Sequence, residues 1–155
     1  TTKKHKKELF ICDIDNTIAD TWPSLVDPPS DVHYLYQNLP VLIGPGDYVR
    51  GKMSEDNNIV FLTARDEVYY DDTKKWLKKN NFWISGKCNL LLVKKAQHKL
   101  FHIKYLVRKY EVIYMDDLSY NHEHGVVLFY DEMIDNIRSL NLTYIDYSAI
   151  LRMTL

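Results

Sequence analysis

Two aspartates and a threonine are spaced at single-residue intervals after a short apolar run near the start of the chain. Asp13 and Asp15 follow Phe10-Ile11-Cys12, and Thr17 comes two residues later. Adjacent carboxylates repel each other unless a cation or a shared proton relieves the repulsion. In α/β sheets, ligands bind where the strands end. The spacing therefore predicts a Mg²⁺ site or a proton-transfer site at the end of a buried strand.

Other polar side chains follow later apolar runs in the same way. Thr63 and Arg65 follow the second run, and Asp116 and Asp117 follow the fourth. Lys99 lies in the first turn of the helix expected before that fourth run. Parallel strands end at one edge of a sheet, so these groups should converge. Carboxylates suit a hard cation, whereas a guanidinium and an ammonium suit phosphate.

The elements that must position these groups alternate between strands and helices. Apolar runs bounded by breakers predict strands, and apolar positions at helical spacing predict helices. The strands are expected at residues 8–12, 58–62, 89–93, 112–115, 126–129 and near 143–145, and the helices at 31–38, 45–54, 66–79, 96–110 and 132–140. Alternation of this kind predicts an α/β protein with a parallel, Rossmann-like sheet of about five strands and helices on both faces.

Two of these segments carry further expectations. The helix at 66–79 should turn Val68, Thr73, Trp76 and Leu77 inward. Residues 18–44 contain several prolines and are expected to form an irregular flap or a short cap around one short helix.

Length and composition are those of a single globular domain. The chain has 155 residues, 46% hydrophobic and 26% charged. No apolar run reaches the roughly 18 residues of a membrane span. Residues 1–7 read as a flexible basic arm and not as a signal peptide. The two cysteines, Cys12 and Cys88, lie in strand-like runs and are expected to be buried thiols of a cytoplasmic protein.

Charge is distributed unevenly, although the net charge is only −1. The span 74–109 contains eleven basic residues and no acid, and from residue 111 onward eight acids face two arginines. A basic block on two successive helices can attract a polyanion. The alternative is two solvated helix faces whose partners lie elsewhere in the fold.

The polar residues at 13–17, 63, 99 and 116–117, taken in chain order, resemble the four motifs of the haloacid dehalogenase superfamily of phosphohydrolases. The segment Asp13-Ile14-Asp15-Asn16-Thr17 is similar to the first motif, Asp-x-Asp-x-Thr. Thr63 resembles the second, Lys99 the third and Asp116-Asp117 the fourth. The resemblance covers essentially the whole chain and implies the superfamily's Rossmann-like fold.

One branch of the superfamily looks closer than the others. The phosphatase domain of bacteriophage polynucleotide kinases has a similar Ser/Thr-x-Arg second motif, here Thr63-Ala64-Arg65. It also has a similar helix with Asp-Thr and a later Trp, here Asp72, Thr73 and Trp76. This likeness is less specific, because Arg follows the second motif elsewhere in the superfamily too.

The resemblance implies a reaction through an aspartyl-phosphate. Asp13 is expected to attack phosphorus, and Asp15 to protonate the leaving alkoxide and then deprotonate water. Thr63 and Lys99 are expected to hold the non-bridging phosphoryl oxygens.

It also implies a Mg²⁺ site and contacts to substrate. The expected metal ligands are Asp13, the backbone carbonyl of Asp15 and Asp116, with Asp117 in or beside the metal's ligand shell. The expected substrate contacts are Arg65, Thr17 and Lys95. For the motif lysine three other residues compete with Lys99: Lys94, Lys95 and Lys104.

Loop lengths bear on the substrate. Between Thr17 and Thr63 lie 45 residues and between Thr63 and Lys99 lie 35, which leaves no room for a large cap domain. Members of this superfamily that lack a cap domain resemble enzymes that act on bulky substrates. A nucleic-acid 3′-phosphate is therefore the leading candidate for the substrate. The alternatives are a nucleotidase or general phosphomonoesterase, and a regulatory module that binds phosphate without turnover. We expect no membrane partner and no obligate protein partner.

Overall fold

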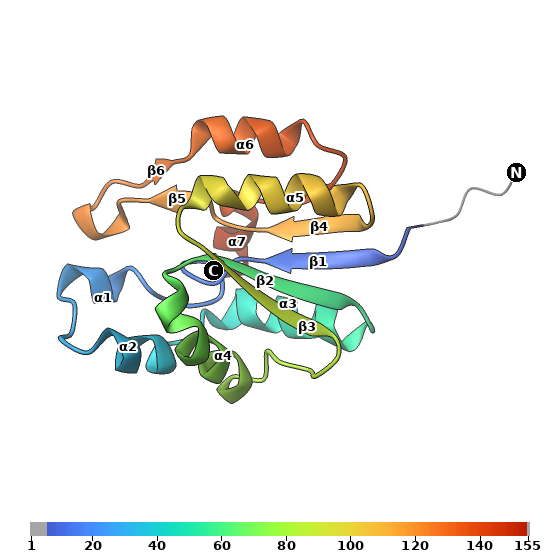
Figure 1. Cartoon of the computed structure of the whole chain (residues 1–155). Coiled ribbons are helices and arrows are strands. Elements are labelled where there is room, and N and C mark those ends of the chain that lie inside the picture. The colour runs from blue at the N-terminus through green and yellow to red at the C-terminus, as the bar shows by residue number, and fades with distance from the viewer. Residues whose placement is uncertain (1–5, 155) are drawn as a thin grey trace, which may run out of the picture.

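The computed structural model describes residues 6–154 and contains one five-stranded parallel sheet. The strand order is β3-β2-β1-β4-β7 (Figure 1). The strands are β1 (Glu8–Cys12), β2 (Asn58–Ala64), β3 (Cys88–Val93), β4 (Glu111–Met115) and β7 (Thr143–Ile145). The first strand of the chain is therefore central, which places the residues that follow it in the middle of the sheet edge. The predicted fold class is confirmed.

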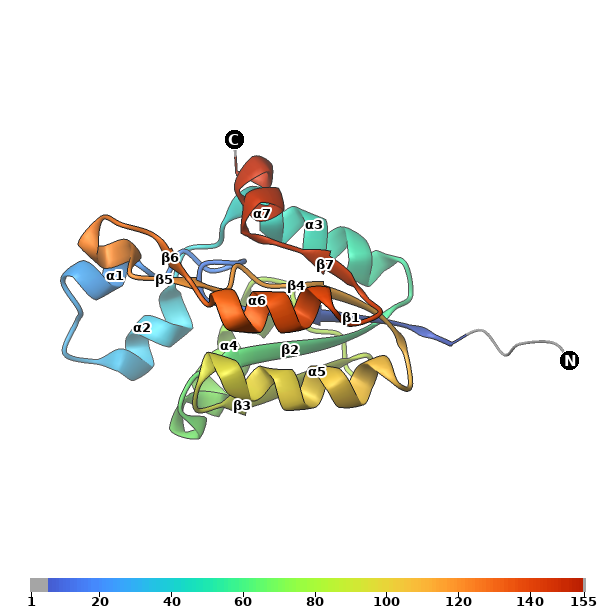
Figure 2. The ribbon, with the colours of Figure 1, turned by 90° about the horizontal axis from the view of Figure 1, so that it is seen from above.

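Helices cover both faces of this sheet (Figures 1 and 2). They are α3 (Ile43–Ser54), α4 (Tyr70–Lys79), α5 (Lys99–Val107), α6 (Asp131–Arg138) and α7 (Tyr147–Met153). Side chains of α3, α4 and α7 share one buried cluster, and side chains of α5 and α6 share the other.

Successive side chains of β1 point to opposite faces of the sheet and so enter the two different buried clusters. Phe10 and Cys12 point into the cluster under α3, α4 and α7, whereas Leu9 and Ile11 point into the cluster under α5 and α6. Successive strand residues face opposite sides of a sheet, and burial of each such side chain contributes about 1.5–3 kcal/mol. The strand is thus fixed from both faces, and the chain that leaves it at Asp13 starts from a rigid point.

Residues 18–44 form a compact segment with two short helices, α1 (Pro23–Val26) and α2 (Val32–Asn38). Backbone hydrogen bonds pin its ends together: Leu42 N–H donates to the Ile18 carbonyl at 2.8 Å and Asp20 N–H to the Pro40 carbonyl at 2.9 Å. The expected helix near 31–38 is present, with Asp31 as its N-cap. The segment is a small cover at the carboxyl edge of the sheet.

One predicted strand lies elsewhere. The run at 126–129 was expected in the sheet, but only β6 (Leu128–Phe129) forms, and it pairs antiparallel with β5 (Ser119–Tyr120). Val126 and Leu128 are largely exposed, so no buried face draws this run into the sheet. The fifth sheet strand is β7, and the hairpin β5–β6 stands beside the sheet's carboxyl edge, with the turn η3 (His122–His124) at its tip.

Smaller differences concern helix starts. The helix expected at 66–79 begins as η1 (Glu67–Tyr69), where the Asp66 side chain accepts from Val68 N–H at 3.0 Å, and the one at 96–110 begins as η2 (Ala96–His98). Val68 was expected to face inward but is 62% exposed. It lies in η1, which precedes the helix α4 that packs on the sheet. The helix α7 and the short α1 were not predicted.

The N-terminal arm is described only from Lys6. Lys6 Nζ donates to the Val107 carbonyl at 3.1 Å, and the Lys7 carbonyl accepts from Glu111 N–H at 2.9 Å, so these two residues lead directly into β1. Residues 1–5 of the expected arm lie outside the described residues. Cys12 and Cys88 are buried free thiols, as expected. Across residues 6–154, no helix has both the length and the apolar character of a membrane span.

Candidate active site

The strand ends bring a lysine between two buried aspartates. Asp13 follows β1, Asp116 follows β4, and Lys99 begins α5. Lys99 Nζ donates to Asp13 Oδ1 at 2.9 Å and to Asp116 Oδ2 at 2.7 Å. All three side chains are at most 6% exposed. The ammonium therefore joins two strand ends that are adjacent in the sheet but about a hundred residues apart in the chain.

Thr17 connects a third carboxylate to this pair. Its Oγ1 lies 2.9 Å from Asp13 Oδ2 and 3.0 Å from Asp117 Oδ1, and it accepts from Asp117 N–H at 3.2 Å. Asn16 has a left-handed backbone (φ 61°), which asparagine tolerates well and which turns Thr17 back toward Asp13. A hydroxyl has one proton, so Thr17 donates to only one of the two carboxylates at a time.

The cluster carries more negative than positive charge. Asp13, Asp116 and Asp117 each offer a carboxylate oxygen, and these oxygens all lie within 4.8 Å of one another. Burial, with Asp116 nearby, raises the pKa of Asp13 well above its usual range, and the same two causes raise the pKa of Asp117 to about 6. Lys99 balances one of the three charges. A divalent cation fits the remaining deficit, and buried carboxylate oxygens are donors that Mg²⁺ accepts.

Asp116 is held independently of any ligand. Its Oδ2 accepts from the Tyr114 hydroxyl, and its Oδ1 accepts from Leu118 N–H at 3.0 Å. Tyr114 lies in β4, and Asp116 is the first residue after that strand, so the buried tyrosine hydroxyl reaches the carboxylate two residues further along the chain. Neither contact was expected, because a tyrosine in an apolar strand reads as core.

Asp15 faces a separate group of side chains around Arg65. Arg65 donates through Nε to Asp15 Oδ2 at 2.9 Å and through Nη2 to Asp15 Oδ1 at 2.7 Å, a bidentate pair. Thr21 Oγ1 donates to Asp15 Oδ1 at 2.6 Å, and Thr63 Oγ1 lies 3.4 Å from Asp15 Oδ2. Burial acts to raise the pKa of Asp15, but Arg65 and Thr21 outweigh it, so the pKa is lowered.

Arg65 is itself enclosed. Its Nη1 donates to Thr73 Oγ1 at 2.9 Å, and the ring of Tyr36 lies over its guanidinium carbon at 3.9 Å. Its side chain is 1% exposed. Arg65 was expected to hold substrate phosphate. In this structure its guanidinium binds both carboxylate oxygens of Asp15, and the ring of Tyr36 covers one face of the guanidinium.

Helix α4 contacts both the small cover at residues 18–44 and the side chains around Arg65. Asp72 accepts from Gln37 Nε2 at 2.6 Å and bonds His33 Nδ1 at 2.5 Å, both residues of α2. Trp76 Nε1 donates to the Leu39 carbonyl at 2.7 Å. The residues Asp72, Thr73 and Trp76, singled out by resemblance, thus each make a defined contact. Asp72 and Trp76 hold the cover, and Thr73 holds Arg65.

The structure therefore brings the predicted residues together in two groups. The first, which we call the Lys99 cluster, consists of Asp13, Thr17, Lys99, Asp116 and Asp117. The second, which we call the Arg65 cluster, consists of Asp15, Thr21, Tyr36, Thr63, Arg65 and Thr73. Both line or adjoin one cavity of about 130 Å³. The contacts of Thr21 with Asp15 and of Tyr36 with Arg65 were not predicted from the sequence.

The positions of three predicted residues bear on their expected roles. The carboxyl group of Asp15 lies outside the metal-competent triad, so only its backbone carbonyl is left for the expected metal role. Thr17, expected at the substrate, is buried among Asp13 and Asp117. Lys95, also expected at the substrate, is exposed, as are Lys94 and Lys104; Lys99 is the lysine that reaches the aspartates, because it occupies the first position of α5.

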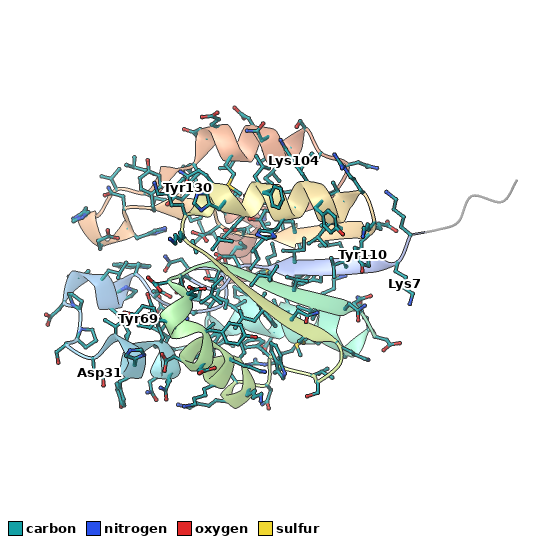
Figure 3. The ribbon with its side chains drawn as sticks, viewed as in Figure 1. Lys7, Asp31, Tyr69, Lys104, Tyr110 and Tyr130 are labelled. Carbon is teal, nitrogen blue, oxygen red and sulfur yellow. The ribbon has the colours of Figure 1, made fainter. Side chains whose placement is uncertain are left out.

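The basic block does not form one surface. Its lysines on α4 and those on α5 lie on opposite faces of the sheet, because the two helices pack in different buried clusters (Figure 3). Lys104 on α5 and Tyr69 before α4 mark these two sides in the figure. The interpretation as two solvated helix faces fits this arrangement better than a single polyanion-binding face.

Comparison with known proteins gives matches at the level of structure alone. No protein-family model and no curated protein matches the chain by sequence. A class C acid phosphatase from Bacillus anthracis, solved with tungstate bound, aligns with a TM-score of 0.60 at 15% identity over 98% of this chain and 74% of its own. The Pnkp1/Rnl/Hen1 RNA repair complex aligns with a TM-score of 0.58 at 16% identity over 95% of this chain, which spans 46% of the matched chain. At these identities the likeness shows the fold alone: the chain shares with both structures a Rossmann-like α/β architecture, in which helices cover a parallel sheet.

Proposed function

We propose that this protein is a Mg²⁺-dependent phosphomonoesterase that works through an aspartyl-phosphate on Asp13. The observation that carries the proposal is the Lys99 cluster. Lys99 Nζ bridges Asp13 and Asp116 at 2.9 and 2.7 Å, and a carboxylate oxygen of Asp117 lies within 4.8 Å of carboxylate oxygens of both aspartates. A buried ammonium beside surplus carboxylates offers a place for a dianionic phosphoryl group and for its counter-cation.

Asp13 is the proposed nucleophile. Lys99 and Thr17 contact different oxygens of its carboxylate, which fixes the plane of the group. Attack by one oxygen on phosphorus forms the acyl-phosphate bond while the ester P–O bond breaks, and the leaving oxygen takes a proton. Water then attacks phosphorus, releases inorganic phosphate and restores the carboxylate.

The metal would be held by Asp13, Asp116 and the backbone carbonyl of Asp15, with Asp117 as a further oxygen donor or as the group that orients the others. These donors fit Mg²⁺, since they are all oxygen and the three carboxylates are clustered. When bound, the ion supplies positive charge that offsets repulsion between the carboxylate nucleophile and the phosphate. Thr63 and Lys99 supply donors for the non-bridging oxygens.

Asp15 is proposed to move the protons. As a base it fits without change, because Arg65 and Thr21 keep it ionised. As an acid it must first carry a proton, so we infer that substrate binding weakens the Arg65–Asp15 pair before the ester bond breaks. Until then Arg65 positions Asp15, and the guanidinium released from Asp15 then contacts the substrate phosphate, as the resemblance implies.

For the substrate we propose a nucleic-acid 3′-phosphate end. The cover over the site is only the short α1–α2 segment, and Lys94 and Lys95 are exposed where β3 ends. One of the two similar structures is an RNA repair complex. A mononucleotide phosphatase is the second candidate, because the cavity at the aspartates is small and partly covered.

A substrate panel tests the proposal. Purified protein should hydrolyse 3′-phosphorylated oligonucleotide faster than 5′-phosphorylated oligonucleotide, mononucleotides or phosphopeptide, and excess EDTA should stop the reaction. Preference for mononucleotides would favour the second candidate. Full activity in EDTA would contradict the metal role, and phosphate binding without any turnover would point to a regulatory module.

A further inference from the structure

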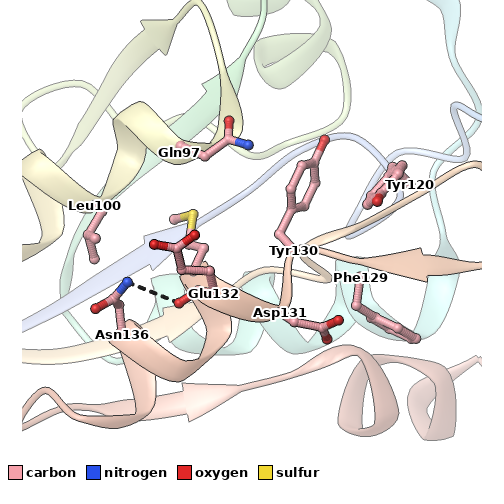
Figure 4. A pocket seen from close by; sticks show the side chains of 9 residues that line it. Gln97, Leu100, Tyr120, Phe129, Tyr130, Asp131, Glu132 and Asn136 are labelled. Atoms are coloured by element: carbon pink, nitrogen blue, oxygen red, sulfur yellow. Dashed lines mark hydrogen bonds between the residues drawn. The ribbon is translucent and has the colours of Figure 1, made fainter.

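A second, larger cavity lies beside the aspartates, between α5, α6 and the β5–β6 hairpin. Its volume is about 520 Å³ (Figure 4). Aromatic rings line the hairpin side, and amide and carboxylate groups line the helix side; the residues used below are Gln97, Tyr120, Tyr130, Asp131, Glu132 and Asn136. We call this the hairpin pocket. None of the roles proposed above uses it.

The hairpin pocket is continuous with the candidate active site. Tyr130 lines both cavities. The chain that enters α5 also borders both cavities, since Lys99, the first residue of α5, lines the small cavity and Gln97, in η2 just before it, lines the hairpin pocket. In Figure 4, Tyr130 stands between Gln97 and Tyr120. A group bonded to a phosphate at Lys99 therefore has Tyr130 as its neighbour.

The aromatic wall suits a flat ring. Tyr120 is 42% exposed, and its ring centroid lies 4.7 Å from that of Tyr130 with the two ring planes tilted by 39°, so the pair leaves part of the Tyr120 ring open to a ligand. Such exposed aromatic pairs stack well on nucleobases, whatever the base, because each base has a π-face.

The opposite wall excludes phosphate. Asp131 and Glu132 are exposed carboxylates at the start of α6 and repel a second phosphate group. They and the amides of Gln97 and Asn136 can instead bond the edge of a base. Asn136 Nδ2 donates to the Glu132 backbone carbonyl at 3.0 Å, which fixes the amide and leaves its oxygen available.

We propose that the hairpin pocket binds the nucleobase of the nucleotide that carries the scissile phosphate. The inference rests on the proposed phosphatase function and adds a part of the substrate to it. The polynucleotide chain must then leave the site away from α6, because that wall is acidic.

Paired substrates test this placement. We would measure kcat/KM for an oligonucleotide whose 3′-phosphate is on a normal nucleotide and for the same oligonucleotide with an abasic terminal residue. Wild-type protein should prefer the substrate with the base by about 10-fold, as expected for one stacked base. Tyr120→Leu should remove most of this preference and leave hydrolysis of the abasic substrate unchanged, and Gln97→Ala should reduce the preference partly.

Two aromatic variants serve as controls. Tyr105→Leu removes a half-exposed tyrosine of α5 that lines neither cavity, and the preference should persist. Trp22→Leu removes an aromatic ring from the separate cavity beside Asn16, and the preference should again persist.

The outcomes separate the two proposals. If neither substrate is hydrolysed, the proposed function fails and this inference falls with it. If wild-type protein hydrolyses both substrates equally, or if Trp22→Leu removes the preference and Tyr120→Leu does not, the hairpin pocket is not the base site although the phosphatase proposal stands.

Discussion

Asp13 and Asp15 are two residues apart, yet they belong to clusters with opposite electrostatics. In the Lys99 cluster three carboxylates share one ammonium, and the pKa values of Asp13 and Asp117 are raised by burial and by Asp116. In the Arg65 cluster one carboxylate meets one guanidinium in a bidentate pair, and the pKa of Asp15 is lowered despite its burial.

The difference lies in which groups are satisfied by the protein itself. The Arg65 cluster is electrically complete without a ligand. The Lys99 cluster carries surplus negative charge, which only an added cation or proton can offset. The two aspartates therefore have different proposed roles, which follow from their different partners. Asp13 binds the metal and attacks the phosphate, whereas Asp15 transfers protons.

The largest expected effect comes from the nucleophile. Asp13→Asn should reduce phosphate release to the level of a protein-free blank, because an amide oxygen cannot form the acyl-phosphate. Initial rates with an activated aryl phosphate and Mg²⁺ measure this. Asp56→Asn, which changes a highly exposed aspartate bonded to Lys87, is the matched control and should keep full activity. Equal loss in both variants would contradict the assignment.

Removal of the ammonium should come next. Lys99→Met should lower kcat by about 10²–10³-fold, as for loss of one donor to the phosphoryl oxygens. It also leaves buried carboxylates without their partner, which should cost about 3–5 kcal/mol of unfolding free energy. Chemical denaturation measures the cost, and Mg²⁺ should restore part of it. Wild-type stability in this variant would show that Lys99 does not balance the aspartates.

Metal binding should distinguish the two clusters directly. Mg²⁺ at about 100 times its dissociation constant should stabilise the fold by about 2.7 kcal/mol. Asp116→Asn should abolish the stabilisation, whereas Arg65→Met should retain it, because Arg65 contacts none of the three clustered carboxylates. Thermal unfolding with and without Mg²⁺ measures this. Loss of the effect in Arg65→Met alone would place the metal at Asp15.

The smallest effect concerns the fastening of the cover. Burial acts to raise the pKa of Asp72, but His33 and Gln37 outweigh it and lower the pKa. Its contribution is therefore complete above the pKa of an unfolded aspartate, about 3.9, and is lost as the pH falls through the folded pKa. Asp72→Asn should cost about 1 kcal/mol at neutral pH, since His33 is mostly exposed and the pair is screened.

Its control is Asp47→Asn, an exposed aspartate paired with Arg50. That variant should keep wild-type stability at neutral pH and the wild-type decline in acid. Urea titrations at several pH values compare the two, and Asp72→Asn should show a smaller decline below pH 4. An identical decline in Asp72→Asn and wild type would show that this carboxylate does not fasten α2 to α4.

Sequence patterns predicted the strand ends, which depend on neighbouring residues in the chain. They did not predict side-chain partners that come from distant parts of the chain. The end of β1 and the acids after β4 follow from apolar runs and their breakers, so Asp13 and Asp116 could be placed at one sheet edge. The Arg65–Asp15 pair could not be foreseen, because an arginine after a strand can reach either a ligand or a neighbour. The hairpin β5–β6 was misplaced for a related reason: its apolar residues are exposed, and apolar character alone does not report burial.

The central claim is that Asp13 carries the phosphoryl group during turnover. Acid quenching during steady-state hydrolysis, followed by peptide mass spectrometry, tests it most directly. We expect one added phosphoryl group, acid-stable and base-labile, on the peptide that contains Asp13, and we expect none in Asp13→Asn. Turnover with the phosphoryl group on another residue, or undiminished turnover in Asp13→Asn, would contradict it.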